Sequence, residues 1–230
     1  MADVIQGLLS TVTAFQGHHT NQACHKSGIT SPGYHGVQWY NRPKLSGHQE
    51  CNLKELVAIF IDGSNFYRVL EANKGRHNLD FQKFAVNLVG ARRLLRTYYY
   101  TAAVDQFRGL ERYKEQQKFF YSLHRTPYLE MRLGRLVVHG NEEVEKGVDV
   151  RLAIDMLKLA WADAYDTAIL VSHDGDFADA ILAVKEMGKH VECAGFINPN
   201  TPSKIADRLT QVADKVIALD GDYLDKCWLK

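Results

Sequence analysis

The sequence has no closely spaced cysteine pairs and few prolines. Its four cysteines, Cys24, Cys51, Cys193 and Cys227, lie far apart, which excludes the dense disulfide framework of a small secreted domain and a conventional zinc motif. Only 5 of the 230 residues are proline, whereas 46% are hydrophobic and 24% are charged. This composition is typical of a folded globular protein rather than a disordered one.

The sequence also lacks a long apolar run and an excess of charge of either sign. No segment approaches the roughly 20 apolar residues of a membrane helix, and the opening MADVIQGLLSTVTAFQG is a poor signal peptide. We therefore expect no membrane association and a reducing, cytoplasmic location. Lys and Arg total 28 against 27 acidic residues, so no overall field attracts nucleic acid. An anionic partner has to be held locally.

Several common catalytic motifs are absent as well. No GxGxxG turn follows the first apolar run, and there is neither a Walker loop nor a GxSxG elbow. These absences disfavour a classical dinucleotide-binding domain, a P-loop enzyme and a serine hydrolase.

Composition divides the chain near residue 53. Residues 1–52 are rich in Gly, Ser, His and Asn without helical or strand periodicity, which predicts an irregular extension. Its histidines and cysteines match no compact zinc module. We expect one domain over residues 53–220 and a short C-terminal tail over residues 221–230.

Within residues 53–220, apolar runs alternate with amphipathic helical stretches. The runs at 56–61, 97–104, 134–140, 167–172 and 190–196 predict strands, and KVIALD predicts a short last one. The most regular helical pattern lies between them, where Val148, Leu152, Met156 and Ala160 recur every four residues. Such alternation predicts the α/β class, a three-layer α/β/α sandwich with a mostly parallel central sheet.

Carboxylates follow the ends of separate predicted strands. Asp62 ends the first strand, Asp174 and Asp176 follow the fourth, and Asp149 lies in the first turn of a helix. Since these positions share one edge of such a sheet, we expect the four side chains to converge. Each alone is also consistent with helix capping, but together they predict a site for a hard cation, Mg²⁺ or Mn²⁺.

Three stretches around these aspartates resemble the signature blocks of the NYN domain, a branch of the PIN-like nuclease superfamily: FIDGSNFYRVL (60–70), EKGVDVRLAIDML (145–157) and LVSHDGDFADAI (170–181). The LabA-like group is the most similar branch, and the resemblance covers roughly residues 56–219. It implies a metal-dependent ribonuclease. The positions that match the family's acidic and hydrogen-bonding residues are Asp62, Asn65, Asp149, Ser172, Asp174 and Asp176. His173 departs from the family's usual glycine, and a side chain there is expected to narrow access to the metal or to contact RNA.

Basic residues near these stretches are candidates for phosphate contacts. Lys146 and Arg151 flank Asp149, and Arg68 lies within the first block. A wider set is compatible with a track for single-stranded RNA but equally with the wet face of amphipathic helices: Arg92, Arg93, Arg96, Lys114, Lys118, Arg125, Arg132 and Arg135, with Phe66, Tyr67, Phe107 and Tyr113 available for stacking.

Two functions remain open at this point. One is hydrolysis of RNA phosphodiester bonds at the four-aspartate site. The other is a PIN-like module that binds RNA or a protein partner and regulates without cleaving, because an intact carboxylate set is necessary for hydrolysis but not sufficient. The sequence leaves homo-oligomerisation open.

Overall fold

The computed structural model describes residues 54–104, 109–139 and 142–229. They form a seven-stranded sheet in the order β4-β3-β2-β1-β5-β6-β7, in which β4 alone is antiparallel to its neighbour. The strands are β1 (Leu56–Asp62), β2 (Arg93–Ala102), β3 (Leu129–His139), β4 (Glu142–Lys146), β5 (Thr167–Val171), β6 (His190–Gly195) and β7 (Lys215–Ala218). The predicted α/β class with a mostly parallel sheet is confirmed.

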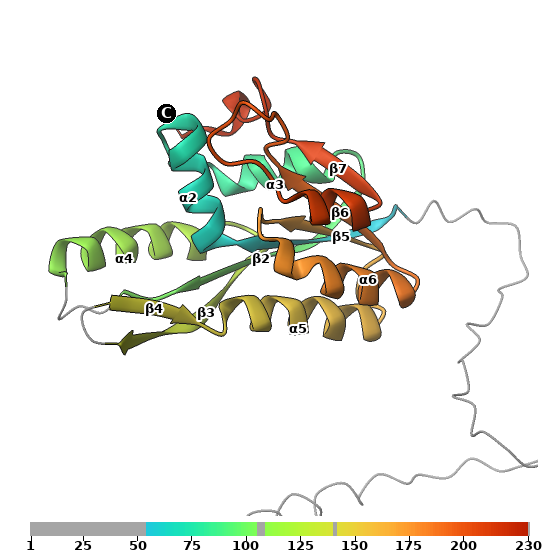
Figure 1. Ribbon diagram of the computed structural model, residues 1–230, viewed down its shortest axis with the longest axis horizontal. Coiled ribbons are helices and arrows are strands. Elements are labelled where there is room, and N and C mark those ends of the chain that lie inside the picture. Colours follow the sequence, from blue (N-terminus) through green and yellow to red (C-terminus); the bar gives the residue numbers. More distant parts are fainter. Residues whose placement is uncertain (1–53, 105–108, 140–141, 230) are drawn as a thin grey trace, which may run out of the picture. The chain divides into compact units, whose positions relative to one another are not determined.

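Helices cover both faces of this sheet (Figure 1). They are α2 (Gly63–Lys74), α3 (Phe81–Val89), α4 (Leu110–His124), α5 (Val148–Trp161), α6 (Ala178–Glu186) and α7 (Asp207–Val212), with short 3₁₀ helices at Gly175–Phe177 and Asp225–Cys227. Side chains of α2, α3 and α4 pack into the core on one face, and side chains of α5, α6 and α7 pack into the core on the other. The predicted three layers are therefore present.

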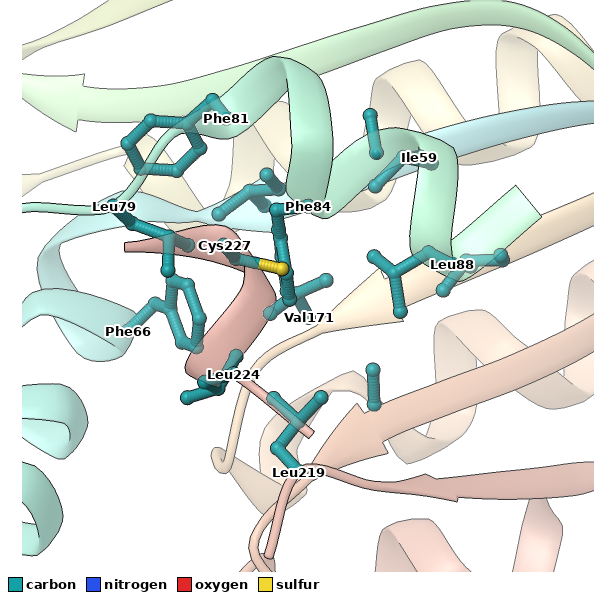
Figure 2. Packing of buried hydrophobic residues seen from close by; sticks show 14 of the residues in the cluster. Ile59, Phe66, Leu79, Phe81, Phe84, Leu88, Val171, Leu219, Leu224 and Cys227 are labelled. Carbon is teal, nitrogen blue, oxygen red and sulfur yellow. The ribbon is translucent and has the colours of Figure 1, made fainter. Parts of the chain in front are cut away.

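The core on the α2–α3 face is built largely from aromatic and branched side chains (Figure 2). The Phe66 and Phe84 rings stack with their centroids 5.4 Å apart. Leu224 and Cys227, which the sequence analysis assigns to a tail, are fully buried in this core. The backbone beyond them pairs Trp228 with Leu79 in an antiparallel bridge.

Three strands differ from the sequence prediction by several residues or more. β2 begins at Arg93, four residues before the predicted start at residue 97. β3 begins at Leu129, five residues before the predicted start at Gly134, and β4 is not predicted at all. β4 reads EEVEK, so a search for apolar runs cannot detect it. It exists because the end of β3 continues past the parallel sheet and folds back on itself, pairing Arg135 with Lys146.

None of the helices in the described ranges combines the length and hydropathy that a bilayer crossing needs. The irregular extension predicted for residues 1–52 lies outside the described residues.

Candidate functional site

The strand order creates a crevice between the carboxyl ends of β1 and β5. From β1 the chain crosses to β2 on one side, and from β5 it crosses to β6 on the other. The following helices diverge at such a point, which is where open α/β sheets bind ligands. Asp62 is the last residue of β1, and Ser172 directly follows β5. Because Ile61 is paired with Val171, Asp62 and Ser172 come next on neighbouring strands.

Asp62 is buried, with 3% of its surface exposed, and both of its carboxylate oxygens accept hydrogen bonds. The backbone N–H of Asn65 donates to Oδ1 over 3.1 Å, which caps the start of α2. The hydroxyl of Ser172 donates to Oδ2 over 3.1 Å. These bonds fix the orientation of the carboxylate group.

The loop after β5 is tied to α2 through Asn65. Its side-chain oxygen accepts a hydrogen bond from the backbone N–H of His173 over 3.1 Å. Within the loop, the N–H of Asp174 donates to Ser172 Oγ over 3.1 Å, and the N–H of Asp176 donates to Asp174 Oδ1 over 3.0 Å. A continuous hydrogen-bonded path therefore connects Asp62 with the loop that carries Asp174 and Asp176.

Asp149 approaches the same loop from the first turn of α5. Although Asp149 is exposed, partial desolvation of its carboxyl group raises the pKa, and the negative charges of Asp174 and Asp176 raise that pKa further, while the Arg68 guanidinium lowers it. Asp149, Asp174 and Asp176 are thus close enough to repel one another. A positive charge among them would relieve that repulsion.

The His173 side chain is not placed where it could narrow access to a metal or contact RNA, as the sequence analysis expects. It is buried, with 7% of its surface exposed, and its Nε2 accepts a hydrogen bond from the backbone N–H of Phe196 over 2.9 Å. Gly195 leaves room for the ring, since a Cβ there would lie 3.1 Å from it. Burial lowers the pKa of His173 to about 4, although nearby Asp220 partly offsets that effect. His173 therefore anchors the loop to β6. A single sequence carries no signal for this bond, because its partner is a backbone group 23 residues away.

The three candidate phosphate contacts differ in their surroundings. Lys146, at the end of β4, and Arg68, on α2, are both exposed. Arg151 is also exposed, but its Nη1 donates to the backbone oxygen of Leu133 over 2.8 Å, which ties α5 to β3. Arg68 is the member of the three whose charge acts on Asp149.

The wider basic set does not form one track. Arg92 forms ion pairs with Glu192 and Glu55 toward the amino end of the strands, away from the crevice. Phe66 is 1% exposed, so it belongs to the core and is not available for stacking, whereas Tyr67 is 47% exposed. Phe107 and the Arg135 side chain lie outside the described residues.

The donors at the crevice fit a hard divalent cation in kind. They are carboxylate oxygens, with an amide and a hydroxyl group that orient them, and such oxygen donors suit Mg²⁺ and Mn²⁺. In the described part of the chain, no three acidic, imidazole or thiol groups lie close enough together to enclose an ion as they stand. Binding an ion would therefore require side-chain adjustment, chiefly of the exposed Asp149 and Asp176.

Comparisons with known proteins agree with this fold. A model of the NYN domain matches residues 56–220. A crystal structure of a protein of unknown function from Vibrio parahaemolyticus superposes with a TM-score of 0.62 at 24% identity, covering 76% of this chain and 99% of the other; this likeness shows the fold alone. A search of the curated proteins found no match. The family match spans most of the chain, and the chain therefore belongs to the NYN domain family, within the PIN-like nuclease superfamily.

Proposed function

We propose that this NYN domain is a metal-dependent ribonuclease of the LabA-like group, which hydrolyses RNA phosphodiester bonds at the crevice between β1 and β5. The observation that carries the proposal is the closeness of Asp174 and Asp176 to Asp149, which comes from a separate segment and whose pKa their charges raise, beside an Asp62 that hydrogen bonds hold in one orientation. Such a cluster is costly for the fold alone.

The proposed roles follow from the contacts of each residue. Asp62, Asp149, Asp174 and Asp176 would hold Mg²⁺ or Mn²⁺. Ser172 and Asn65 orient Asp62 and the loop, as the hydrogen-bonding partners of metal ligands do. A bound ion of this kind activates water and neutralises phosphate charge, so no side-chain nucleophile is required.

Substrate binding is assigned to Arg68, Lys146 and Arg151, which carry positive charge beside the carboxylates. Neither Arg68 nor Lys146 forms an ion pair with another described residue, whereas Arg151 keeps its remaining N–H groups after binding Leu133. NYN domains commonly bind RNA, and we propose a single-stranded substrate. We also propose a cytoplasmic location, supported by Cys193 and Cys227, which are both free thiols.

One observation favours a second function, that of an RNA-binding or protein-binding regulatory module that does not cleave. The acidic groups of the described residues do not enclose an ion without rearrangement. A protein in which that rearrangement is too costly would retain the fold and lose the hydrolysis.

The test is cleavage of labelled single-stranded RNA by the full chain with Mg²⁺ or Mn²⁺, compared with EDTA. Asp174→Asn is expected to abolish cleavage. Asp179→Asn is the matched control, because Asp179 is an exposed aspartate on the following helix that pairs with Arg208. Cleavage that persists in Asp174→Asn would contradict the proposed site. Binding of RNA without cleavage under any metal would favour the regulatory module.

A further inference from the structure

A groove of about 1240 Å³ opens beside the crevice, between α2 and α4. It begins at Gly63 and Ser64, the residues directly after Asp62, and runs past Thr101 at the end of β2 toward Arg112 and Phe119 on α4. Its volume exceeds that of ordinary small-molecule sites, which reach about 1000 Å³. The groove is therefore large enough for a segment of a polymer rather than for one small metabolite.

One arginine contributes positive charge both to the groove and to the carboxylates. Arg68 lines the groove, and its charge also lowers the pKa of Asp149. The charged residues in its described lining are Arg68, Arg112 and Glu115, so the lining has an excess of positive charge. This positive lining favours a chain of phosphates that extends from the crevice into the groove.

The walls of the groove combine aromatic faces with that charge. Tyr67 is 47% exposed on α2, and Phe119 on α4 is partly buried against the core. Nucleobases stack on such side chains in sites for single-stranded nucleic acid, where each stacked base contributes about 1–3 kcal/mol. The groove thus offers both parts of a nucleotide site, a face for the base and cations for the phosphate.

Two hydroxyl groups lie at the end of the groove nearest Asp62. Ser64 Oγ and Thr101 Oγ1 are 3.3 Å apart, and either atom can be the donor. This hydrogen bond uses the proton of one of the two hydroxyl groups. The proton of the other hydroxyl has no acceptor among the described residues. One O–H is therefore free to donate to a sugar hydroxyl or a phosphate oxygen.

We propose that the α2–α4 groove binds a nucleotide of single-stranded RNA that flanks the scissile phosphate, with its base on Tyr67 and its phosphate at Arg112. This inference rests on the proposed ribonuclease function for its substrate class. It adds a binding site that lies outside the carboxylate cluster.

Binding can be measured separately from cleavage. The full chain is titrated in EDTA with a fluorescein-labelled oligouridylate, and Kd is followed by fluorescence anisotropy over a range of salt concentrations. Tyr67→Ala is expected to raise Kd about fivefold or more, whereas Tyr67→Phe, which keeps the ring, is expected to bind like the wild type.

Arg112→Ala tests the phosphate contact. It is expected to reduce the slope of log K against log salt concentration by about 0.7, the value for one phosphate of a single strand. Lys118→Ala is the matched control, since Lys118 is exposed on the same helix and does not line the groove. Its slope is expected to equal that of the wild type. Thermal melting of each variant verifies that it is folded.

The outcomes separate the two proposals. Variant effects as expected without any cleavage in Mn²⁺ would support the groove and contradict the ribonuclease. If the wild type cleaves RNA but Tyr67→Ala leaves Kd unchanged and Arg112→Ala leaves the salt slope unchanged, the proposed RNA site in the groove is overturned. The groove would then be a site for a protein or for another segment of the chain. Equal losses in Arg112→Ala and Lys118→Ala would also overturn it, because they indicate a diffuse field. A wild-type chain that binds no RNA overturns it as well.

Discussion

Ser172 uses its hydroxyl group twice, as donor to Asp62 and as acceptor from the Asp174 N–H. Replacing it with alanine removes both bonds and leaves a buried carboxylate with one fewer partner. We expect Ser172→Ala to lower cleavage about 10- to 100-fold and the free energy of unfolding by about 1–3 kcal/mol, measured by RNA cleavage and urea unfolding. Thr210→Ala, which removes a hydroxyl on α7 that donates to the backbone of its own helix and does not line the groove, is the control. Wild-type cleavage by Ser172→Ala would show that Asp62 does not need this orientation.

The buried His173 makes stability depend on pH. Its pKa is lowered to about 4 in the folded protein, against about 6.5 when unfolded, so between these values the unfolded chain binds more protons. Stability contributed by the neutral ring is present above pH 6.5 and is lost as pH falls toward 4.

Between pH 7 and pH 5 this linkage is expected to lower the free energy of unfolding by about 2 kcal/mol. The measurement is urea unfolding of the metal-free protein at both pH values, beside His173→Gln, whose side-chain oxygen can accept the Phe196 N–H and does not titrate. The difference between the two proteins isolates His173 from the other histidines. Identical pH dependence of both would place the titration elsewhere.

At the scale of elements, the start of α2 depends on Gly63. A Cβ at this position would lie 2.3 Å from the Tyr99 ring, which Phe81 and Phe119 hold from its other sides. We expect Gly63→Ala to displace α2, to destabilise the protein by about 1–3 kcal/mol and to reduce cleavage, since Asp62 caps this helix. Gly109→Ala is the control for stability, because the nearest described atom to a Cβ there, in the Arg112 side chain, is 3.7 Å away, and the substitution should cost less than about 1 kcal/mol. Equal effects of both substitutions would contradict the steric argument.

The sequence predicts the strands whose residues are buried on both faces, because they are continuous apolar runs. It does not predict β4, whose only apolar residue is Val144 and whose existence depends on pairing with β3. The first residues of β3 are not predicted for a different reason. Leu129, Met131 and Leu133 alternate with charged residues, which is a half-buried strand pattern that a search for apolar runs misses.

The candidate site likewise has features that the sequence predicts and features that it does not. Topology alone predicts that Asp62 and Asp174 share one edge, because parallel strands all end there. The bonds from Ser172 to Asp62 and from His173 to Asn65 depend on the register of β1 against β5 and on side-chain rotamers. The groove depends on how α4 packs beside α2, which no local pattern encodes.

In the whole molecule, the two ends of the strands serve different purposes. The carboxyl ends carry the crevice, whereas toward the amino ends Arg92 joins Glu192 of β6 and Glu55 before β1. Two guanidinium nitrogens contact the Glu192 carboxylate at 3.1 and 2.9 Å, and the side chains of Arg92 and Glu192 are only 19% and 10% exposed. The pair raises the pKa of Arg92 despite burial, which alone would lower it. It links the centre of the sheet to β6.

Stability and cleavage should therefore be separable by substitution. Arg92→Met is expected to lower the free energy of unfolding by about 2 kcal/mol, less than the 3–5 kcal/mol of a fully buried pair, because Lys215 also contacts Glu192. Its kcat should equal that of the wild type below the melting temperature, since the pair is remote from the carboxylates. Arg93→Met, which removes an exposed arginine one residue later, should change stability by less than about 0.5 kcal/mol. Urea unfolding and RNA cleavage of the same preparations measure both quantities. Loss of kcat in folded Arg92→Met would mean that the sheet transmits strain from its amino ends to the crevice, and the two ends would then form one functional unit.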